Sequence, residues 1–131
     1  MKPVRNPVPQ LASMFDGWLS PGVRVGNIVY TSGLVGWDLE TGKILTTGTE
    51  AQVRRIFEGL GFILKAHGAT LNDIVKMTMY FTDRKTQWPA FDKVRREIWK
   101  TDPPATTGVG VDQLEQDAQV EIEAIAIIPD V

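Results

Sequence analysis

Two glutamates near the end of the chain have the residue type and spacing for proton chemistry. Residues 120–128 alternate strictly: Val120, Ile122, Ala124, Ala126 and Ile128 would share one strand face, and Glu121, Glu123, Ile125 and Ile127 the other. A carboxylate at a border between water and apolar side chains has a raised pKa and can relay a proton. A strand whose first residues are simply in water explains the same pattern, so both interpretations stay open.

The segment before this strand offers groups that could contact a ligand. It reads Asp102-Pro103-Pro104-Ala105-Thr106-Thr107-Gly108. The hydroxyls of Thr106 and Thr107 either donate to a ligand or only satisfy strand propensity. Gly108 removes a side chain where a ligand could approach, or it marks a bulge. Trp18, Trp37 and Trp88 would form either an aromatic wall or core packing.

Composition excludes several classes of function. The 131 residues contain no cysteine, which rules out disulfides and thiolate chemistry and fits a cytoplasmic protein. His67 is the single histidine, so a metal site with several histidines is impossible. The net charge of −2 argues against a nucleic-acid partner. No apolar run has membrane-spanning length, and Met1-Lys2 is followed by proline rather than by a signal-like apolar block.

The periodicity predicts the elements that must position these groups. Residues 1–21 contain Pro3, Pro7, Pro9 and Pro21 and are expected to form an extended arm, with residues 22–131 as one domain. Gly26-Asn27 predicts a hairpin turn, and a second hairpin is expected around residues 38–42. Helices are expected from Glu50 to Ala66, with a capping box of Thr49 and Gln52, and over residues 87–99. The strand between them, 74–81, would place Val75, Met77, Met79 and Phe81 on one face.

This order of elements predicts an α+β fold with two layers. Two helices would cover one face of a mixed sheet. The last strand carries apolar residues on both faces, so we expect another subunit to cover the other sheet face.

Six segments together resemble the RidA (YjgF-type) family over residues 17–128. They are Val23-Arg24-Val25-Gly26-Asn27, Ser32-Gly33, Glu40-Thr41-Gly42, Thr82-Asp83, Pro103-Pro104-Ala105 and Glu121-Ile122-Glu123-Ala124-Ile125-Ala126. The resemblance implies a chorismate-mutase-like fold, a homotrimer with a cleft at each subunit interface, and neither cofactor nor metal. Archetypal members hydrolyse reactive imines and enamines.

The resemblance also implies roles for individual residues. Glu121 and the carbonyl of Gly108 would hold the attacking water. Where archetypes place a carboxylate-binding arginine, this chain has Thr106, with Thr107 beside it. Further substrate contacts would come from Ser32 and from Leu19, which stands where the family has a tyrosine, with Trp18 beside it. Asp92 would stand where the family has an asparagine, if this chain carries one inserted residue near Trp88, which would also lie at the site.

The sequence therefore favours a hydrolase that deaminates an imine or enamine other than simple 2-imino acids. Its partner would be a small-molecule substrate. The alternative is a non-catalytic small-molecule-binding or regulatory protein on the same fold. A ribonuclease or translation inhibitor fits the acidic balance least well.

Overall fold

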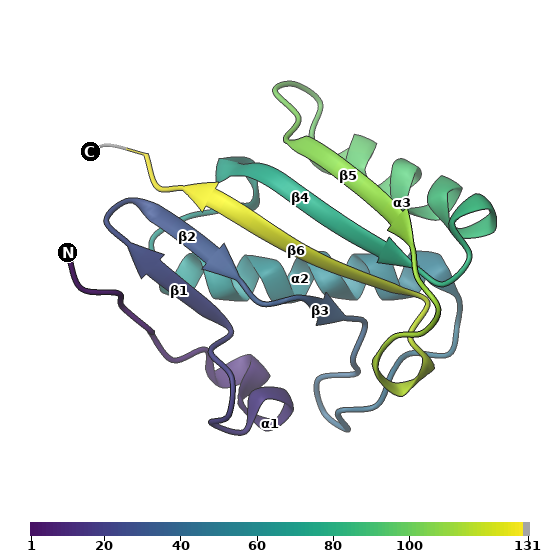
Figure 1. Cartoon of the computed structure of the whole chain (residues 1–131), viewed down its shortest axis with the longest axis horizontal. Coiled ribbons are helices and arrows are strands. Elements are labelled where there is room, and N and C mark those ends of the chain that lie inside the picture. The colour runs from purple at the N-terminus through teal and green to yellow at the C-terminus, as the bar shows by residue number, and fades with distance from the viewer. Residues whose placement is uncertain (130–131) are drawn as a thin grey trace.

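The computed structural model describes residues 1–129; the last two residues of the expected domain, 130–131, lie outside them. The chain forms a mixed sheet with helices on one side (Figure 1). The strands are β1 (Gly22–Val25), β2 (Ile28–Thr31), β3 (Leu34–Val35), β4 (Ile74–Phe81), β5 (Ala105–Gly110) and β6 (Val120–Ile127). The helices are α1 (Ala12–Phe15), α2 (Thr49–Ala66) and α3 (Arg84–Ile98), with 3-10 turns η1 (Pro9–Leu11), η2 (Leu71–Asp73) and η3 (Glu115–Asp117).

The sheet order is β1-β2-β6-β4-β5, with β3 also pairing with β6. Among the strands of residues 1–129, β4 and β5 are the only pair that runs in parallel, because α3 crosses over between them. The hairpin of β1 and β2 turns at Gly26, whose φ of +61° suits glycine, as its sequence predicts. The second expected hairpin is reduced to a turn at Asp38–Gly42, closed by one bridge between Trp37 and Ile44.

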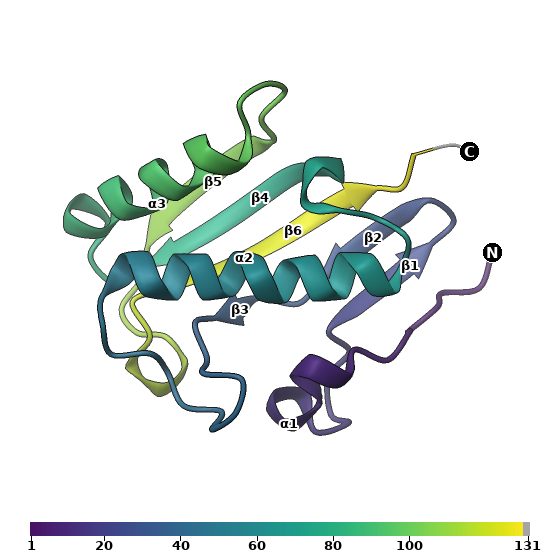
Figure 2. The same cartoon turned by 180° about the vertical axis from the view of Figure 1, so that it is seen from behind.

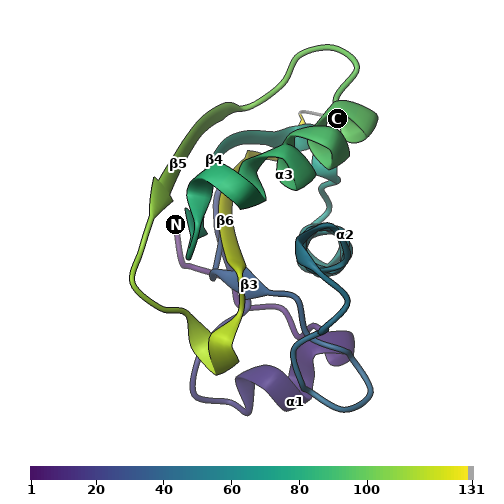
Figure 3. The same ribbon diagram turned by 90° about the vertical axis from the view of Figure 1, so that its right-hand side faces the viewer.

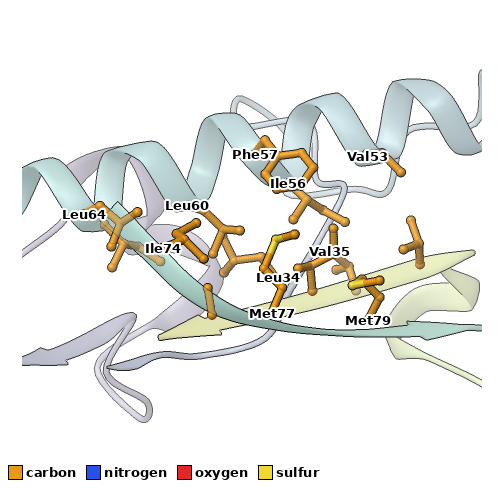
Figure 4. Packing of buried hydrophobic residues seen from close by; sticks show 14 of the residues in the cluster. Leu34, Val35, Val53, Ile56, Phe57, Leu60, Leu64, Ile74, Met77 and Met79 are labelled. Carbon is orange, nitrogen blue, oxygen red and sulfur yellow. The ribbon is translucent and has the colours of Figure 1, made fainter. Parts of the chain in front are cut away.

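The hydrophobic core lies between α2 and the sheet (Figure 4). Val53, Ile56, Leu60 and Leu64 project from one stripe of α2, as helical spacing predicts, and are fully buried. Figure 2 shows α2 running along the sheet with α3 beside it. The expected α+β architecture is therefore confirmed in its coarse form.

Strand β4 departs from simple alternation at its start. The register shifts between Ile74 and Lys76, so Ile74 is buried and Val75 is 46% exposed. The prediction that Val75 faces the core with Met77 is wrong, because one extra residue in a strand reverses the side of everything before it. Hydrophobicity does not distinguish Ile74 from Val75.

Strand β6 confirms the alternation expected for its residues. Val120, Ile122, Ala124 and Ala126 are buried under the helices. The other face of the sheet has no helix on it in the described chain, as Figure 3 shows from the side. Large apolar residues exposed there or at its margin are Tyr30, Val75 and Val109.

The first 21 residues are not an extended arm. Pro9 occupies the first turn of η1, where a missing N–H costs nothing, and α1 follows directly. Val8, Leu11 and Phe15 are buried and join the main core. The expected pair of helices therefore becomes three, and the prolines explain only the segment before residue 9.

The two long helices begin close to their predicted positions, with different contacts. Thr49 is the first residue of α2, and its hydroxyl bonds the side chain of Gln119, so the expected capping box does not form. Ion pairs join the two helices: Lys93 lies 3.0 Å from Glu50, and Glu97 lies 2.8 Å from Arg54. Within residues 1–129 no helix has the length and apolarity needed to cross a membrane.

Two glycines in α2 should respond oppositely to alanine. A Cβ on Gly59 would lie 2.8 Å from Cδ1 of the buried Leu34, whereas one on Gly61 would meet no atom within 4 Å. Close approach of α2 to the sheet therefore requires a glycine at position 59 but not at position 61. We expect Gly61→Ala to raise the unfolding free energy by about 1 kcal/mol through helix propensity. Gly59→Ala should lower it by about 1–2 kcal/mol through overpacking.

Urea denaturation of both variants measures this difference. Equal shifts for the two variants would contradict the packing of Leu34 against α2.

Candidate functional site

A cavity of about 700 Å³ opens at one edge of the sheet. Three separate segments form it: α1 with the residues after it, the stretch from Ser32 to Gly42, and the loop around η3 that leads into β6. Figure 1 shows α1, the end of β3 and the loop before β6 along the same lower edge of the molecule. The lining residues are Ser13, Met14, Phe15, Leu19, Ser32, Gly33, Val35, Trp37, Glu40, Thr41, Gly42, Glu115, Gln116 and Glu121.

Glu121 stands in the wall of this cavity. Its backbone pairs with Val35 on one side and Tyr80 on the other, so it occupies a central strand. Its side chain is half-buried. Burial raises the pKa of Glu121 above its ordinary value, and the charges of Glu123 and Glu115 raise it further. A carboxylate in this state holds and releases a proton closer to neutral pH.

The carboxylate of Glu121 lies directly on the backbone of Gly33. A Cβ at Gly33 would lie 2.9 Å from Cδ of Glu121, closer than such contacts occur. Glycine is therefore required for this approach. Ser32 precedes it, and its hydroxyl donates to the carbonyl oxygen of Ser20 at 2.6 Å, which ties the cavity wall to the segment after α1.

Glu123, two residues further along β6, is engaged differently. It accepts a hydrogen bond of 2.5 Å from the hydroxyl of Tyr80, and this bond raises the pKa of Tyr80. A carboxylate held in this way supports the sheet surface rather than the cavity.

Three of the site residues expected from the sequence line the cavity: Glu121, Ser32 and Leu19. Leu19 is 66% exposed at the cavity rim. Trp18 is 88% exposed and does not line the cavity. Of the three tryptophans considered for an aromatic wall, Trp37 lines the cavity, and the unexpected Phe15 lies beside it with ring centroids 6.0 Å apart.

Thr106, Thr107 and Gly108 lie on the edge strand β5, outside this cavity. Strand β4 separates β5 from β6, so two strand spacings, about 10 Å, separate their backbones. The hydroxyl of Thr106 donates to the carbonyl oxygen of Pro104 at 3.0 Å, and that of Thr107 accepts from Lys76 at 2.7 Å. The Gly108 carbonyl accepts from Nε of Arg84 at 3.2 Å.

Asp92 and Trp88 belong to α3 and also lie outside the cavity. Asp92 pairs with Arg96 at 3.0 Å and also with Arg95, and both arginines lower the pKa of Asp92. Trp88 packs 5.2 Å from the ring of Phe91. Within one copy of the chain, these two residues are a paired surface charge and a packing aromatic.

His67 does not act as a charged cap of α2. It is buried at 1% exposure, and burial together with the nearby charge of Arg24 lowers its pKa. The imidazole is therefore neutral at physiological pH. Asn6 lies 3.4 Å from its Nδ1.

Sequence reasoning missed the acidic and apolar parts of the cavity wall that come from turns. Glu40 lies in a turn, Glu115 begins the 3-10 turn η3, and Met14 lies in the unexpected α1. The way these segments pack around the cavity produces no periodic pattern in the sequence. Among residues 1–129 no group of three or more histidine, aspartate or glutamate side chains is arranged to hold a metal ion.

Comparisons with known proteins agree on one family. Residues 13–128 match the family model described as endoribonuclease L-PSP. A 2-iminobutanoate/2-iminopropanoate deaminase of Dermatophagoides farinae is 33% identical over 98% of this chain and 99% of its own. A RutC family protein of Pyrococcus abyssi is 36% identical over 84% of this chain and 86% of its own.

The fold has a matching counterpart among solved structures. The crystal structure of RidA from the Antarctic bacterium Psychrobacter sp. PAMC 21119 superposes with a TM-score of 0.80 at 37% identity, covering 86% of this chain and 89% of the other. Similarity in fold and similarity in sequence therefore each extend over most of this chain.

Proposed function

Because this chain belongs to the RidA (YjgF-type) family that the endoribonuclease L-PSP model describes, we propose that it hydrolyses a reactive imine or enamine. Its substrate would differ from the simple 2-imino acids that name some of its relatives. The observation that carries the proposal is Glu121, a half-buried carboxylate with a raised pKa, in the wall of a cavity large enough for a metabolite.

The proposed reaction needs one water and one group that moves a proton. A protonated imine carbon is electrophilic, and Glu121 accepts a proton from water as the oxygen attacks that carbon. Glu121 then returns this proton to the amino nitrogen of the resulting carbinolamine, which regenerates the carboxylate. The carbon–nitrogen bond breaks as the hydroxyl oxygen becomes the carbonyl oxygen, and the released ammonia takes the hydroxyl proton. Protonated imine and water thus become a carbonyl compound and ammonium.

We propose that three copies of the chain assemble and complete the site. The uncovered sheet face carries exposed Tyr30, Val75 and Val109, apolar area that a partner subunit would bury. The edge strand β5 has a free side in the described chain. A neighbouring copy that sets its β5 against the cavity would bring Thr106 and the Gly108 carbonyl toward Glu121, and the carbonyl keeps one lone pair for water after bonding Arg84.

Thr106 is the reason for proposing a substrate other than 2-imino acids. A threonine hydroxyl cannot form the two charge-assisted bonds with which a guanidinium holds a carboxylate. In this chain the Thr106 hydroxyl already donates to Pro104. The cost of losing such a partner is about 2–5 kcal/mol.

Imines released in solution by amine or amino-acid oxidases test the proposal. We expect the protein to accelerate the decay of at least one carboxylate-free imine at least 100-fold over the rate in buffer. The acceleration for 2-iminopropanoate should be far smaller. Ligand binding without turnover of any imine or enamine would favour the alternative, a binding or regulatory protein.

A further inference from the structure

The cavity around Glu121 is lined by carboxylates without a balancing cation. Glu40, Glu115 and Glu121 contribute to its wall. The lining residues that the structure describes include no lysine or arginine. The three acids come from a turn, a loop and a strand, so the charge belongs to the assembled cavity rather than to one element.

The negative charge of Glu115 acts inside the cavity as well as at its rim. It is one of the two charges that raise the pKa of Glu121. Glu123 is the other, and it faces the sheet surface through its bond to Tyr80. A carboxylate ligand placed beside Glu121 would meet the same repulsion, whereas a cation would relieve it.

Part of the cavity wall is apolar and aromatic. Phe15 and Trp37 meet edge to face, with an interplanar angle of 74°. Met14, Val35 and Leu19 extend this surface. Such a wall binds an aromatic or branched apolar group and attracts cations to the ring faces.

Two cationic side chains contact β5, the proposed side of the site, and both are already engaged: Lys76 donates to the Thr107 hydroxyl at 2.7 Å, and the other is Arg84. Its Nε donates to the Gly108 carbonyl at 3.2 Å, and its guanidinium lies 5.0 Å from the ring centre of Trp88. Thr106 supplies no charge. The cavity wall therefore presents acids and aromatic rings to a ligand, and the lysine and arginine that contact β5 already have other partners.

We propose that this cavity selects cationic imines that carry an aromatic or branched apolar group and lack a carboxylate. This inference rests on the proposed function, because it specifies the substrate class of the same site. The acids favour the protonated carbon–nitrogen double bond, which is also the form that water attacks most readily.

Three ligands with the same ring and different charges test the selection. Benzamidinium is a stable planar analogue of a protonated imine, benzamide is its neutral counterpart, and benzoate its anionic one. By isothermal titration at pH 7.5 we expect benzamidinium to bind at least 10-fold more tightly than benzamide, and benzoate not to bind. Equal affinities for benzamidinium and benzoate would overturn the proposal.

Variants locate the effect. Glu40→Gln combined with Glu115→Gln keeps Glu121 and should weaken benzamidinium 10-fold or more while leaving benzamide unchanged. Glu58→Gln is the control, because Glu58 is exposed on α2, pairs with Arg55 at 3.6 Å and does not line the cavity. If Glu58→Gln lowered benzamidinium affinity as much as the double variant does, net charge alone, and not the cavity, would govern binding.

Turnover separates this inference from the proposed function. 2-Phenylethanimine should be hydrolysed with kcat/KM at least 10-fold above that of 2-imino-3-phenylpropanoate, which differs by its carboxylate. Fast hydrolysis of both would overturn the selection and leave the hydrolase intact. Selective benzamidinium binding with hydrolysis of neither would support the cation site and refute the hydrolase.

Discussion

Glu121→Gln should reduce the hydrolysis of the best imine substrate at least 100-fold and at the same time stabilise the fold. Glutamine keeps the shape of the side chain but cannot exchange a proton, and general acid–base groups contribute about 10²–10⁴-fold to rate. The stabilisation follows from the cause of the raised pKa, which is burial of a negative charge near Glu123 and Glu115. We expect the melting temperature at pH 8 to rise by roughly 1–4 °C.

The raised pKa of Glu121 also determines how the stability of the fold changes with pH. The folded-state pKa of Glu121 lies above the ordinary value of 4.5. Its protonated form therefore stabilises the fold fully below pH 4.5, and this stabilisation is lost as the pH rises through the folded-state value. The advantage of Glu121→Gln should thus increase from pH 4.5 to pH 8 in urea unfolding. His67 has a lowered pKa and acts in the opposite direction, but it is common to both proteins and cancels.

Gly33→Ala provides a matched test that leaves the charge of Glu121 in place. The added methyl group meets the end of the Glu121 side chain, which can rotate away at little cost in stability. We expect turnover to fall at least 10-fold with a small change in unfolding free energy. Full activity in either variant would mean that the Glu121 carboxylate does not handle the proton.

The fold could be predicted where residues repeat with a period. The core stripe of α2 and the alternation of β6 both follow from side chains that must reach the same apolar layer. Val75 was misplaced because a bulge is set by pairing with β6, which local hydrophobicity does not encode. The helix α1 was missed because proline at a first turn and proline in an extended segment look alike in sequence.

The candidate site could be predicted only in part, for a related reason. Glu121 was identifiable because its acid interrupts an apolar alternation. Glu115 and Glu40 reach the cavity through irregular turns, and no spacing relates them to Glu121. Thr106 and Gly108 lie two strands away from Glu121 in the sheet order. Their proposed role therefore depends on a second copy of the chain, which no property of a single chain specifies.

Thr106→Arg should create the carboxylate contact that this chain lacks. A guanidinium at that position would hold pyruvate, or the imine derived from it, through two charge-assisted hydrogen bonds. Since losing such a partner costs about 2–5 kcal/mol, we expect pyruvate affinity and kcat/KM for 2-iminopropanoate to rise roughly 10- to 1000-fold. The exposed position on an edge strand accommodates the longer side chain without loss of core packing.

Two further variants distinguish geometry from charge. Thr106→Lys adds the same charge without the planar guanidinium group, so its pyruvate affinity should increase less than that of Thr106→Arg. Thr101→Arg places an arginine at an exposed position before β5 and should leave pyruvate affinity unchanged. If Thr106→Arg leaves pyruvate affinity unchanged, β5 does not face the cavity of a neighbouring copy. In that case the acids around Glu121 alone, rather than the missing arginine, would determine which imines the protein accepts.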